Sequence, residues 1–313
     1  MLRLAIVSPC YNEEAVLERS TERLDALLDS LRRSGKISPD SFILYVDDGS
    51  ADGTWPLIER LHSQNPGVKG LRLAHNVGHQ NAIMAGMMTA RPLCEGCITI
   101  DADLQDELSC IEQMIDAHAC GSDVVYGVKV ERSADSALKK WTAEAYYKTL
   151  EAFGVDTIFN HADFRFLSRK VLDALAQYPE RNLYLRALIP QIGFKSSTVD
   201  DHLSPREAGE SKYTLRKMLR LALDGITSFT VKPLYIIIGA GLVFLVISLL
   251  IAVYVTVSIV TGHVAAGWSS LMLSLWFVGG AVLVAVGVTG LYVGKIYSEV
   301  KRRPLYTVDE FLD

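Results

Sequence analysis

The chain has 313 residues, of which 50% are apolar and 21% charged, and its formal net charge is −5 at pH 7. That length allows one or two domains with an ample core, and the negative charge gives no reason to expect a nucleic-acid partner. The five cysteines are odd in number and unevenly spaced, which argues against a disulfide framework and favours a reducing compartment.

The first part of the chain alternates strand-like and helix-like patterns. Asn12 is expected to cap a first helix, in which leucines recur at helical spacing up to Leu31. Short apolar runs predict strands at residues 4–7, 42–46, 68–73, 97–100 and 124–127. This alternation predicts a mainly parallel α/β sheet, in which ligands bind beyond the carboxyl ends of the strands.

Two familiar nucleotide-binding signatures and one metal signature are absent or incomplete. The turn after the first strand, Ser8 to Glu13, has no glycine, so it does not carry the GxGxxG of a dinucleotide-binding domain, and no Walker P-loop occurs. Cys94 and Cys97 form a lone CxxC without a second pair. We therefore interpret these two cysteines as ordinary buried residues.

Paired carboxylates follow two of the predicted strands. Asp47 and Asp48 come after the second, and Asp101 and Asp103 come after the fourth. On an extended backbone, alternate residues point to one side, so Asp101, Asp103 and Gln105 could offer oxygen ligands together. Mg²⁺ and Mn²⁺ prefer such oxygen ligands and often bridge them to phosphate.

The last third of the chain has the composition of a membrane anchor. Residues 212–232 predict an amphipathic helix in the membrane interface, for which an ordinary globular helix is the alternative. Two uncharged apolar runs, 234–260 and 264–294, predict a pair of transmembrane helices with a short connection. Lys and Arg flank the pair on both sides but are absent from the connection, which predicts that both ends are cytosolic.

Several motifs in the first two thirds resemble those of family 2 glycosyltransferases. They are Ser8 to Glu14, Val46 to Thr54, Asn76 to Gln80 and Asp101 to Asp106. Further motifs, together with the two apolar runs, are similar to the polyprenyl-phosphate branch, which includes bactoprenol glucosyltransferases and dolichol-phosphate mannosyltransferases. These further motifs are Asp163 to Arg165, Pro179 to Asn182, Gly209 to Tyr213, Asp224 to Phe229 and Lys301 to Tyr306.

The resemblance implies a GT-A type nucleotide-diphospho-sugar transferase fold and assigns roles to individual residues. The donor would be bound by Pro9, Tyr11, Glu13, Asp47, Asp48, Asp101, Ala102 and Asp103. The metal, Mg²⁺ or Mn²⁺, would be bound by Asp101, Asp103 and Gln105. The acceptor phosphate would be bound by Lys129, Arg132, Arg206, Ser211 and Lys212. The catalytic set would be Asp101, Asp103, Asp163, Arg165, Arg206 and Lys212.

Some of these roles have structural alternatives, and two positions depart from the family pattern. Asp163 could instead cap a helix or pair with Arg165, and Arg206 and Lys212 could belong to a solvated basic loop. No proline occurs in Asp106 to Leu108, and His79 stands where many relatives have lysine. Both departures weaken any transfer of sugar specificity from the relatives.

Together these features predict an enzyme with a catalytic domain at 1–211, an interfacial helix at 212–232, a membrane hairpin within 233–295 and a cytosolic tail at 296–313. We expect an inner-membrane protein that transfers a sugar from a nucleotide sugar, UDP-glucose first, to a polyprenyl phosphate, undecaprenyl phosphate first. A GDP-mannose or modified-sugar donor is the alternative, and a non-catalytic nucleotide-sugar-binding scaffold is the alternative of another class. A processive synthase is disfavoured because the chain has no QxxRW motif. The resemblance also implies a homo-tetramer.

Overall fold

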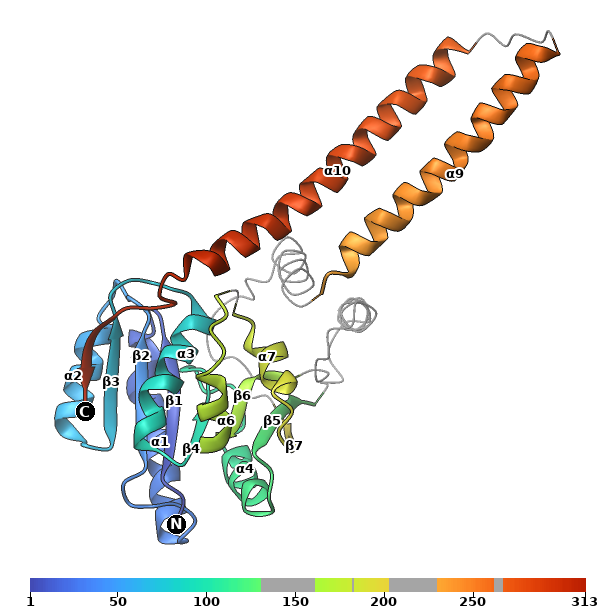
Figure 1. The fold of residues 1–313 in the computed structure, drawn as a ribbon. Helices are drawn as coiled ribbons and strands as arrows, with labels where there is room; N and C mark the ends of the chain where they lie inside the picture. Colours follow the sequence, from blue (N-terminus) through green and yellow to red (C-terminus); the bar gives the residue numbers. More distant parts are fainter. Residues whose placement is uncertain (131–160, 182, 203–229, 262–266) are drawn as a thin grey trace. The chain divides into compact units, whose positions relative to one another are not determined.

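The computed structural model describes residues 1–130, 161–181, 183–202, 230–261 and 267–313, and Figure 1 shows their fold. These residues divide into two compact units. The first holds a β-sheet with its covering helices and includes the C-terminal residues 303–313. The second holds two long helices, α9 (Lys232–Val260) and α10 (Trp268–Lys301).

An eight-stranded sheet with the order β7-β5-β6-β4-β1-β2-β3-β8 forms the centre of the first unit. Its strands are β1 (Leu4–Cys10), β2 (Phe42–Asp47), β3 (Val68–Leu73), β4 (Gly96–Thr99), β5 (Val124–Lys129), β6 (His161–Ser168), β7 (Ser196–Asp201) and β8 (Val308–Leu312). Pairings β1–β2, β1–β4, β2–β3 and β5–β7 are parallel, and those of β6 with β4 and β5 and of β8 with β3 are antiparallel. The predicted, mainly parallel sheet is confirmed.

Helices cover both faces of this sheet (Figure 1). Alternate residues of β1 point to opposite faces, as a strand requires. Leu4 and Ile6 join the core beneath α1 and α2, whereas Val7 lies against α3. The helices of the first unit are α1 (Glu14–Arg33), α2 (Thr54–Gln64), α3 (His79–Ala90), α4 (Ser109–Ala119), α6 (Arg169–Leu175) and α7 (Leu185–Gln191).

Helix α3 approaches the sheet closely because it carries a glycine where it crosses β1 and β2. A Cβ atom on Gly86 would lie 2.4 Å from Val7 Cγ1 and 2.7 Å from Val46 Cγ2. The close approach brings the first residue of α3, His79, to the carboxyl ends of the parallel strands, where it lies 3.5 Å from Asp101, one of the predicted carboxylates after β4.

Two local predictions are wrong. Asn12 does not cap α1, because its φ is 56° and its side-chain oxygen accepts a hydrogen bond from Ala51 N at 2.9 Å. The segment after β4 is a turn rather than an extended strand, since Leu104 N donates to Asp101 O at 3.1 Å. Leu104 has the left-handed φ of 44°, a conformation that non-glycine residues rarely adopt.

The predicted C-terminal tail contains an edge strand of the sheet. Strand β8 pairs with β3 so that Leu312 lies opposite Gly70 and Phe311 opposite Leu71. Ala74 N also donates to Thr307 O at 2.9 Å, which extends the pairing beyond the strand. The chain therefore returns to the first unit after α10.

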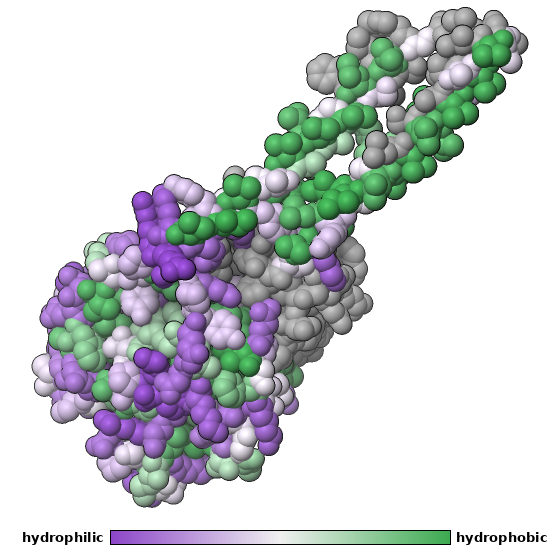
Figure 2. All heavy atoms as spheres, in the orientation of Figure 1, coloured by the Kyte–Doolittle hydropathy of each residue, from purple (hydrophilic) through white to green (hydrophobic). Residues whose placement is uncertain are grey.

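Helices α9 and α10 are long and apolar enough to cross a membrane. Their surface is mostly hydrophobic, whereas the surface of the first unit mixes polar and apolar side chains (Figure 2). Helix α9 matches the predicted run, and α10 extends past the uncharged run to Lys301, where Arg302 ends it at a φ of 47°. The predicted interfacial helix lies, up to residue 229, outside the described residues.

Candidate active site

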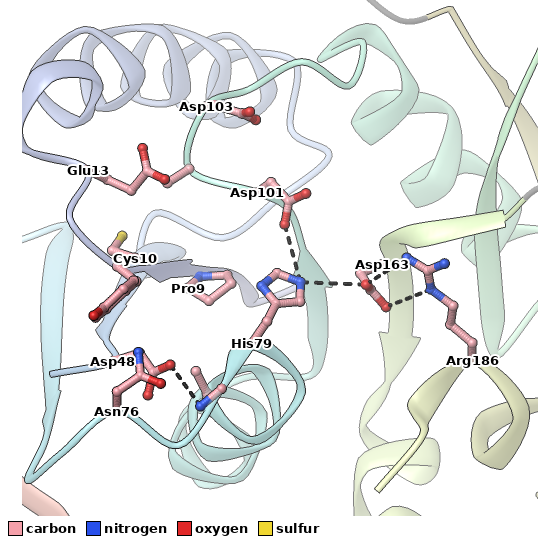
Figure 3. A pocket seen from close by; sticks show the side chains of 14 residues that line it. Pro9, Cys10, Glu13, Asp48, Asn76, His79, Asp101, Asp103, Asp163 and Arg186 are labelled. Atoms are coloured by element: carbon pink, nitrogen blue, oxygen red, sulfur yellow. Dashed lines mark hydrogen bonds and ion pairs between the residues drawn. The ribbon is translucent and has the colours of Figure 1, made fainter. Parts of the chain in front are cut away.

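A pocket of about 590 Å³ opens at the carboxyl ends of β1, β2 and β4. Parallel strands meet at this edge, where Cys10 is aligned with Asp47 and Val7 with Thr99. The pocket is lined by Pro9, Cys10, Tyr11, Glu13, Asp48, Asn76, Gly78, His79, Ala82, Asp101, Ala102, Asp103, Asp163 and Arg186 (Figure 3). Of the residues assigned to the site from the sequence, this lining brings together Pro9, Tyr11, Glu13, Asp48, Asp101, Ala102, Asp103 and Asp163.

One end of the pocket is built on the loops after β1 and β2. Tyr11 is 49% exposed there, so its ring is available for a flat ligand such as a base. Glu13 N donates to Thr54 Oγ1 at 2.9 Å, which fixes the start of α1. Burial raises the pKa of Glu13, and the nearby carboxylates of Asp103 and Asp101 add to the rise.

The two aspartates after β2 lie in different environments. Asp48 lines the pocket, and its carboxylate accepts hydrogen bonds from the backbone N–H groups of Val77 at 2.7 Å and Gly78 at 3.0 Å. Asp47 is buried beneath it, with one carboxylate oxygen accepting from Ser50 N at 3.1 Å. The other oxygen of Asp47 has no hydrogen-bond partner among the described residues.

The turn after β4 exposes Asp101 and Asp103 to the pocket while Ala102 and Leu104 are buried. Desolvation in the pocket raises the pKa of Asp101; the Asp163 and Asp103 carboxylates add to the rise, and His79 opposes it. Gln105 lies outside the lining, and its amide nitrogen donates to Asp103. The side chain of Gln105 is thus placed to orient Asp103.

The carboxylates of Asp101 and Asp103 both face the pocket and could supply two oxygen ligands to a divalent cation. Within the described ranges, no three His, Cys, Asp or Glu side chains are grouped to hold a metal ion by themselves. Mg²⁺ typically binds one or two carboxylates and takes its remaining ligands from water and substrate phosphates. Desolvation is the main cause of the raised pKa of Asp101, and a cation beside it would also offset the repulsion from Asp163 and Asp103 that adds to the rise.

Asp163 is the centre of a charged network at the other end of the pocket (Figure 3). Its carboxylate pairs with the fully buried Arg165 and with Arg186 Nη2 at 3.1 Å. His79 Nε2 lies 3.5 Å from both Asp163 Oδ2 and Asp101 Oδ1, and so it links the network to the carboxylates of the turn. The alternative interpretation of Asp163 as a partner of Arg165 is therefore confirmed, although Asp163 also lines the pocket.

The network holds Asp163 ionised. Burial by itself would raise the pKa of Asp163, but His79, Arg165 and Arg186 outweigh it and hold the pKa well below its ordinary value. Desolvation lowers the pKa of His79, but the hydrogen bond to Asp163 and the charge of Asp101 reverse that effect, so the pKa is raised. At neutral pH this end of the pocket thus combines a fixed carboxylate with guanidinium groups.

Other predicted site residues lie elsewhere. Lys129 is the last residue of β5 and does not line the pocket. Its ammonium nitrogen is 3.7 Å from Asp106 Oδ1. Burial raises the pKa of Asp106 to about 7, although Lys129 opposes the rise. The remaining predicted acceptor-phosphate residues, Arg132, Arg206, Ser211 and Lys212, lie outside the described residues.

Sequence reasoning missed two contributions to the site. Arg186 is the only charged residue in α7, whose other early residues Leu185, Ala187 and Leu188 are buried, and a lone charge in an apolar helix was the available signal. His79 was noted only as a departure from the family pattern. Its link between Asp101 and Asp163 joins three segments that are far apart in the sequence.

The fold and the pocket together define an α/β enzyme class that binds its ligand at the carboxyl ends of parallel strands. The chain belongs to glycosyltransferase family 2, whose family model, Glycosyl transferase family 2, matches residues 5–176. Its catalytic class is therefore that of a glycosyltransferase.

Individual relatives extend the similarity beyond the family model. The chain is 44% identical over 306 residues to the uncharacterized glycosyltransferase YkoT of Bacillus subtilis (strain 168), covering 98% of this chain and 91% of the relative. It is 34% identical over 310 residues to the bactoprenol glucosyl transferase of Shigella phage SfII, covering 98% and 97%. A solved structure of the mannosyltransferase PcManGT from Pyrobaculum calidifontis in complex with GDP-Man and Mn²⁺ has a TM-score of 0.43 at 14% identity, covering 96% and 87%.

Proposed function

We propose that the protein transfers a monosaccharide from a nucleotide sugar to a polyprenyl phosphate at the cytosolic face of a membrane. UDP-glucose is the first candidate donor and undecaprenyl phosphate the first candidate acceptor. One observation carries the proposal: a single chain combines the acidic pocket around Asp101 and Asp103 with two helices long and apolar enough to span a bilayer. The relative named bactoprenol glucosyl transferase, similar over nearly the whole chain, supports the lipid acceptor.

The pocket residues divide the proposed donor into a nucleotide part and a diphosphate part. Tyr11 and Pro9 would contact the base, and Glu13 and Asp48 would lie near the ribose. Asp101 and Asp103 would hold a divalent cation, which when bound neutralises the charge that develops on the departing nucleoside diphosphate. By holding that cation, the two carboxylates would set the position of the diphosphate and thereby the direction in which it leaves.

The proposed reaction requires little acid–base assistance from the protein. A phosphate monoester carries between one and two negative charges at neutral pH, so its oxygen attacks the sugar without first losing a proton to a base. The new bond joins that oxygen to the anomeric carbon while the bond to the diphosphate breaks. Attack from the face opposite the leaving group inverts the configuration at that carbon.

The membrane assignment rests on α9 and α10 and on the chain's return to the sheet. The described residues up to 202 and residues 303–313, which lie on either side of the two helices in the sequence, belong to the same unit, so both ends of a membrane hairpin made by these helices would lie on one side. The flanking Lys and Arg favour the cytosolic side. The resemblance adds a homo-tetramer to the proposal, which the molar mass of the detergent-purified protein would test.

One experiment identifies the sugar and the nucleotide of the donor. Membranes containing the protein are incubated with undecaprenyl phosphate and a panel of UDP- and GDP-sugars, and the lipid products are identified by mass spectrometry. A hexosyl lipid formed from UDP-glucose supports the first candidate, and a product from GDP-mannose supports the alternative donor. Binding of nucleotide sugars without any lipid product or turnover would instead support a non-catalytic scaffold.

The metal role of the turn is tested by Asp103→Asn. Because the Asp103 side chain is exposed to the pocket, we expect the variant to fold normally but to lose transfer by a factor of about 100 or more, the scale of losing one electrostatic contact to the transition state. Asp40→Asn, at another exposed aspartate outside the pocket, serves as the matched control and should transfer normally. Transfer by Asp103→Asn at the wild-type rate, or undiminished transfer in chelator, contradicts the metal role.

A further inference from the structure

Carboxylates outnumber permanent positive charges among the described residues that line the pocket. Among its described lining residues, Arg186 is the only lysine or arginine, whereas Glu13, Asp48, Asp101, Asp103 and Asp163 all bring carboxylates. The proposed substrates bring a diphosphate and a phosphate monoester to this acidic site. A guanidinium is the side chain best suited to receive phosphate oxygens, because its planar fork donates several hydrogen bonds at once.

The backbone that carries Arg186 is fixed on two sides. Leu185 N donates to Gln80 Oε1 at 3.2 Å, and Leu185 O accepts from Arg165 Nη1 at 3.4 Å. Gln80 lies in α3 and Arg165 in β6, so the start of α7 is tied both to the helix that supplies His79 and to the strand that supplies Asp163. Arg186 therefore extends from a rigid support into the pocket.

The side chain of Arg186 is also oriented by Asp163. Arg186 Nε lies 3.5 Å from Asp163 Oδ1, and Nη2 lies 3.1 Å from Oδ2. The guanidinium nevertheless lines the pocket, and the side chain remains 30% exposed. Asp163 itself is only 9% exposed, and its carboxylate already has Arg165 and His79 as further partners.

We infer that Arg186 is a phosphate-binding residue of the pocket and that Asp163 is the positioning residue that aims its guanidinium. The inference rests on the proposed function for the identity of the substrates. The phosphate oxygens have two sources, the diphosphate of the donor and the phosphate of the lipid acceptor. Both sources offer the same chemistry to Arg186, and kinetics distinguish them.

The test compares Arg186→Gln and Arg186→Lys with the wild type in the full-length, detergent-purified protein. Three quantities are measured: the Kd of UDP with Mg²⁺ by calorimetry, the rate of UDP-sugar hydrolysis without acceptor, and the KM for a short-chain polyprenyl phosphate. Arg60→Gln is the matched control, because Arg60 Nη2 also lies 3.1 Å from a carboxylate, that of Glu18, but outside the pocket lining. Melting temperatures establish that each variant is folded.

A donor contact predicts that Arg186→Gln weakens UDP binding and slows hydrolysis and transfer together, each by about tenfold or more, which corresponds to roughly 1.4 kcal/mol. An acceptor contact predicts an unchanged UDP Kd and hydrolysis rate, with the KM for polyprenyl phosphate raised by about tenfold or more. Arg186→Lys keeps the charge but not the fork, so it should recover part of the loss. Asp163→Asn should change the same quantity in the same direction but by less.

The inference is overturned if Arg186→Gln and Arg186→Lys, both folded, keep all three quantities within about twofold of the Arg60→Gln control, a difference well below the tenfold step. Failure of the proposed function gives a different result: the wild type then transfers no sugar to polyprenyl phosphate. The Kd of UDP still tests the role of Arg186 in that case, because its measurement needs no lipid. A weaker UDP Kd in Arg186→Gln would support the phosphate contact, and an unchanged Kd would overturn it.

Discussion

Arg165 is a guanidinium with none of its surface exposed, and Asp163 is the carboxylate that compensates its charge. Removing one partner of a buried pair leaves the other charge without compensation, which is among the most destabilising single changes in proteins. Thr99 also donates its hydroxyl to the backbone oxygen of Asp163. Asp163 thus supports the fold of β6 and also lines one end of the pocket.

We expect Asp163→Asn to lower the free energy of unfolding by about 3–5 kcal/mol, the range for breaking a buried ion pair. Asp173→Asn is the control, because Asp173 pairs with Arg169 at a surface where such pairs contribute about 1 kcal/mol or less. Thermal unfolding of the two purified variants measures the difference. Equal melting temperatures would contradict the role of Asp163 in the fold.

The stabilisation by Asp163 has a defined pH dependence. Its pKa in the folded protein is depressed, so its contribution is complete above the unfolded-state pKa of about 3.9 and is lost as pH falls through the folded-state value. The gap in melting temperature between wild type and Asp163→Asn should therefore narrow below about pH 4. A gap that stays constant into strong acid would show that the charge of Asp163 is not what stabilises the fold.

The motif residues were predictable from the sequence because each lies next to a strand that an apolar run reveals. Asp48, Asp101 and Asp103 follow buried strands and line the pocket as expected. Arg186 and the bridging position of His79 were not predictable, since both depend on α3 and α7 packing at the same end of the sheet. A single sequence gives periodicity within an element but not the contacts between distant elements.

At the scale of elements, α3 lies close to the sheet because position 86 has no side chain. Alanine normally favours a helix over glycine by about 1 kcal/mol, but a Cβ at Gly86 would lie 2.4 Å from Val7 Cγ1. The overlap with a packed core should outweigh the gain in helix propensity, since overpacking costs about 1–3 kcal/mol. Whether Gly86→Ala stabilises or destabilises the protein is thus decided by the contact of α3 with the sheet, not by helix propensity.

We expect Gly86→Ala to lower the melting temperature and, by shifting α3, to reduce activity through the His79 contacts at its start. Thr89→Ala in the same helix, at a partly exposed position, is the control and should be neutral or slightly stabilising, because alanine is the better helix former. Activity and thermal unfolding are measured for both. A Gly86→Ala variant that is more stable than the wild type would contradict the close packing of α3.

Some strands could be predicted from the sequence and others could not. Strands β1 to β5 follow apolar runs that were recognised, whereas β6 contains Asp163 and Arg165 within a buried strand and so lacks a regular apolar pattern. Strand β8 contains Asp309 and Glu310 and is short. Its place in the sheet depends on pairing with β3, which lies at the opposite end of the sequence.

At the scale of the whole molecule, β8 places residues 303–313, which follow α10, in the same unit as the described residues up to 202. The ion pairs of Lys69 with Asp313 and Arg72 with Asp309 add to the pairing of β8 with β3. If α9 and α10 span a membrane, the connection between them must then lie on the side opposite the catalytic domain.

We therefore expect a cysteine introduced at Thr261, after replacement of the native cysteines, to react with an impermeant thiol reagent added to intact cells. Thr261 lies just after α9, at the end of the hairpin that should face outward. A cysteine at Asp309, which is exposed in β8, should react only after the membrane is permeabilised. Labelling of position 309 and protection of position 261 in intact cells would reverse the proposed topology.

The position of β8 in the sequence also bears on how the protein is made. The free edge of β3 gains its partner only after both apolar helices have been synthesised, because β8 follows them in the chain. Until then the emerging domain has an unpaired strand edge, which is a template for association with other chains. We expect the nascent domain to depend on rapid membrane targeting or a chaperone, since the part of the protein that is translated first is among the last to be completed.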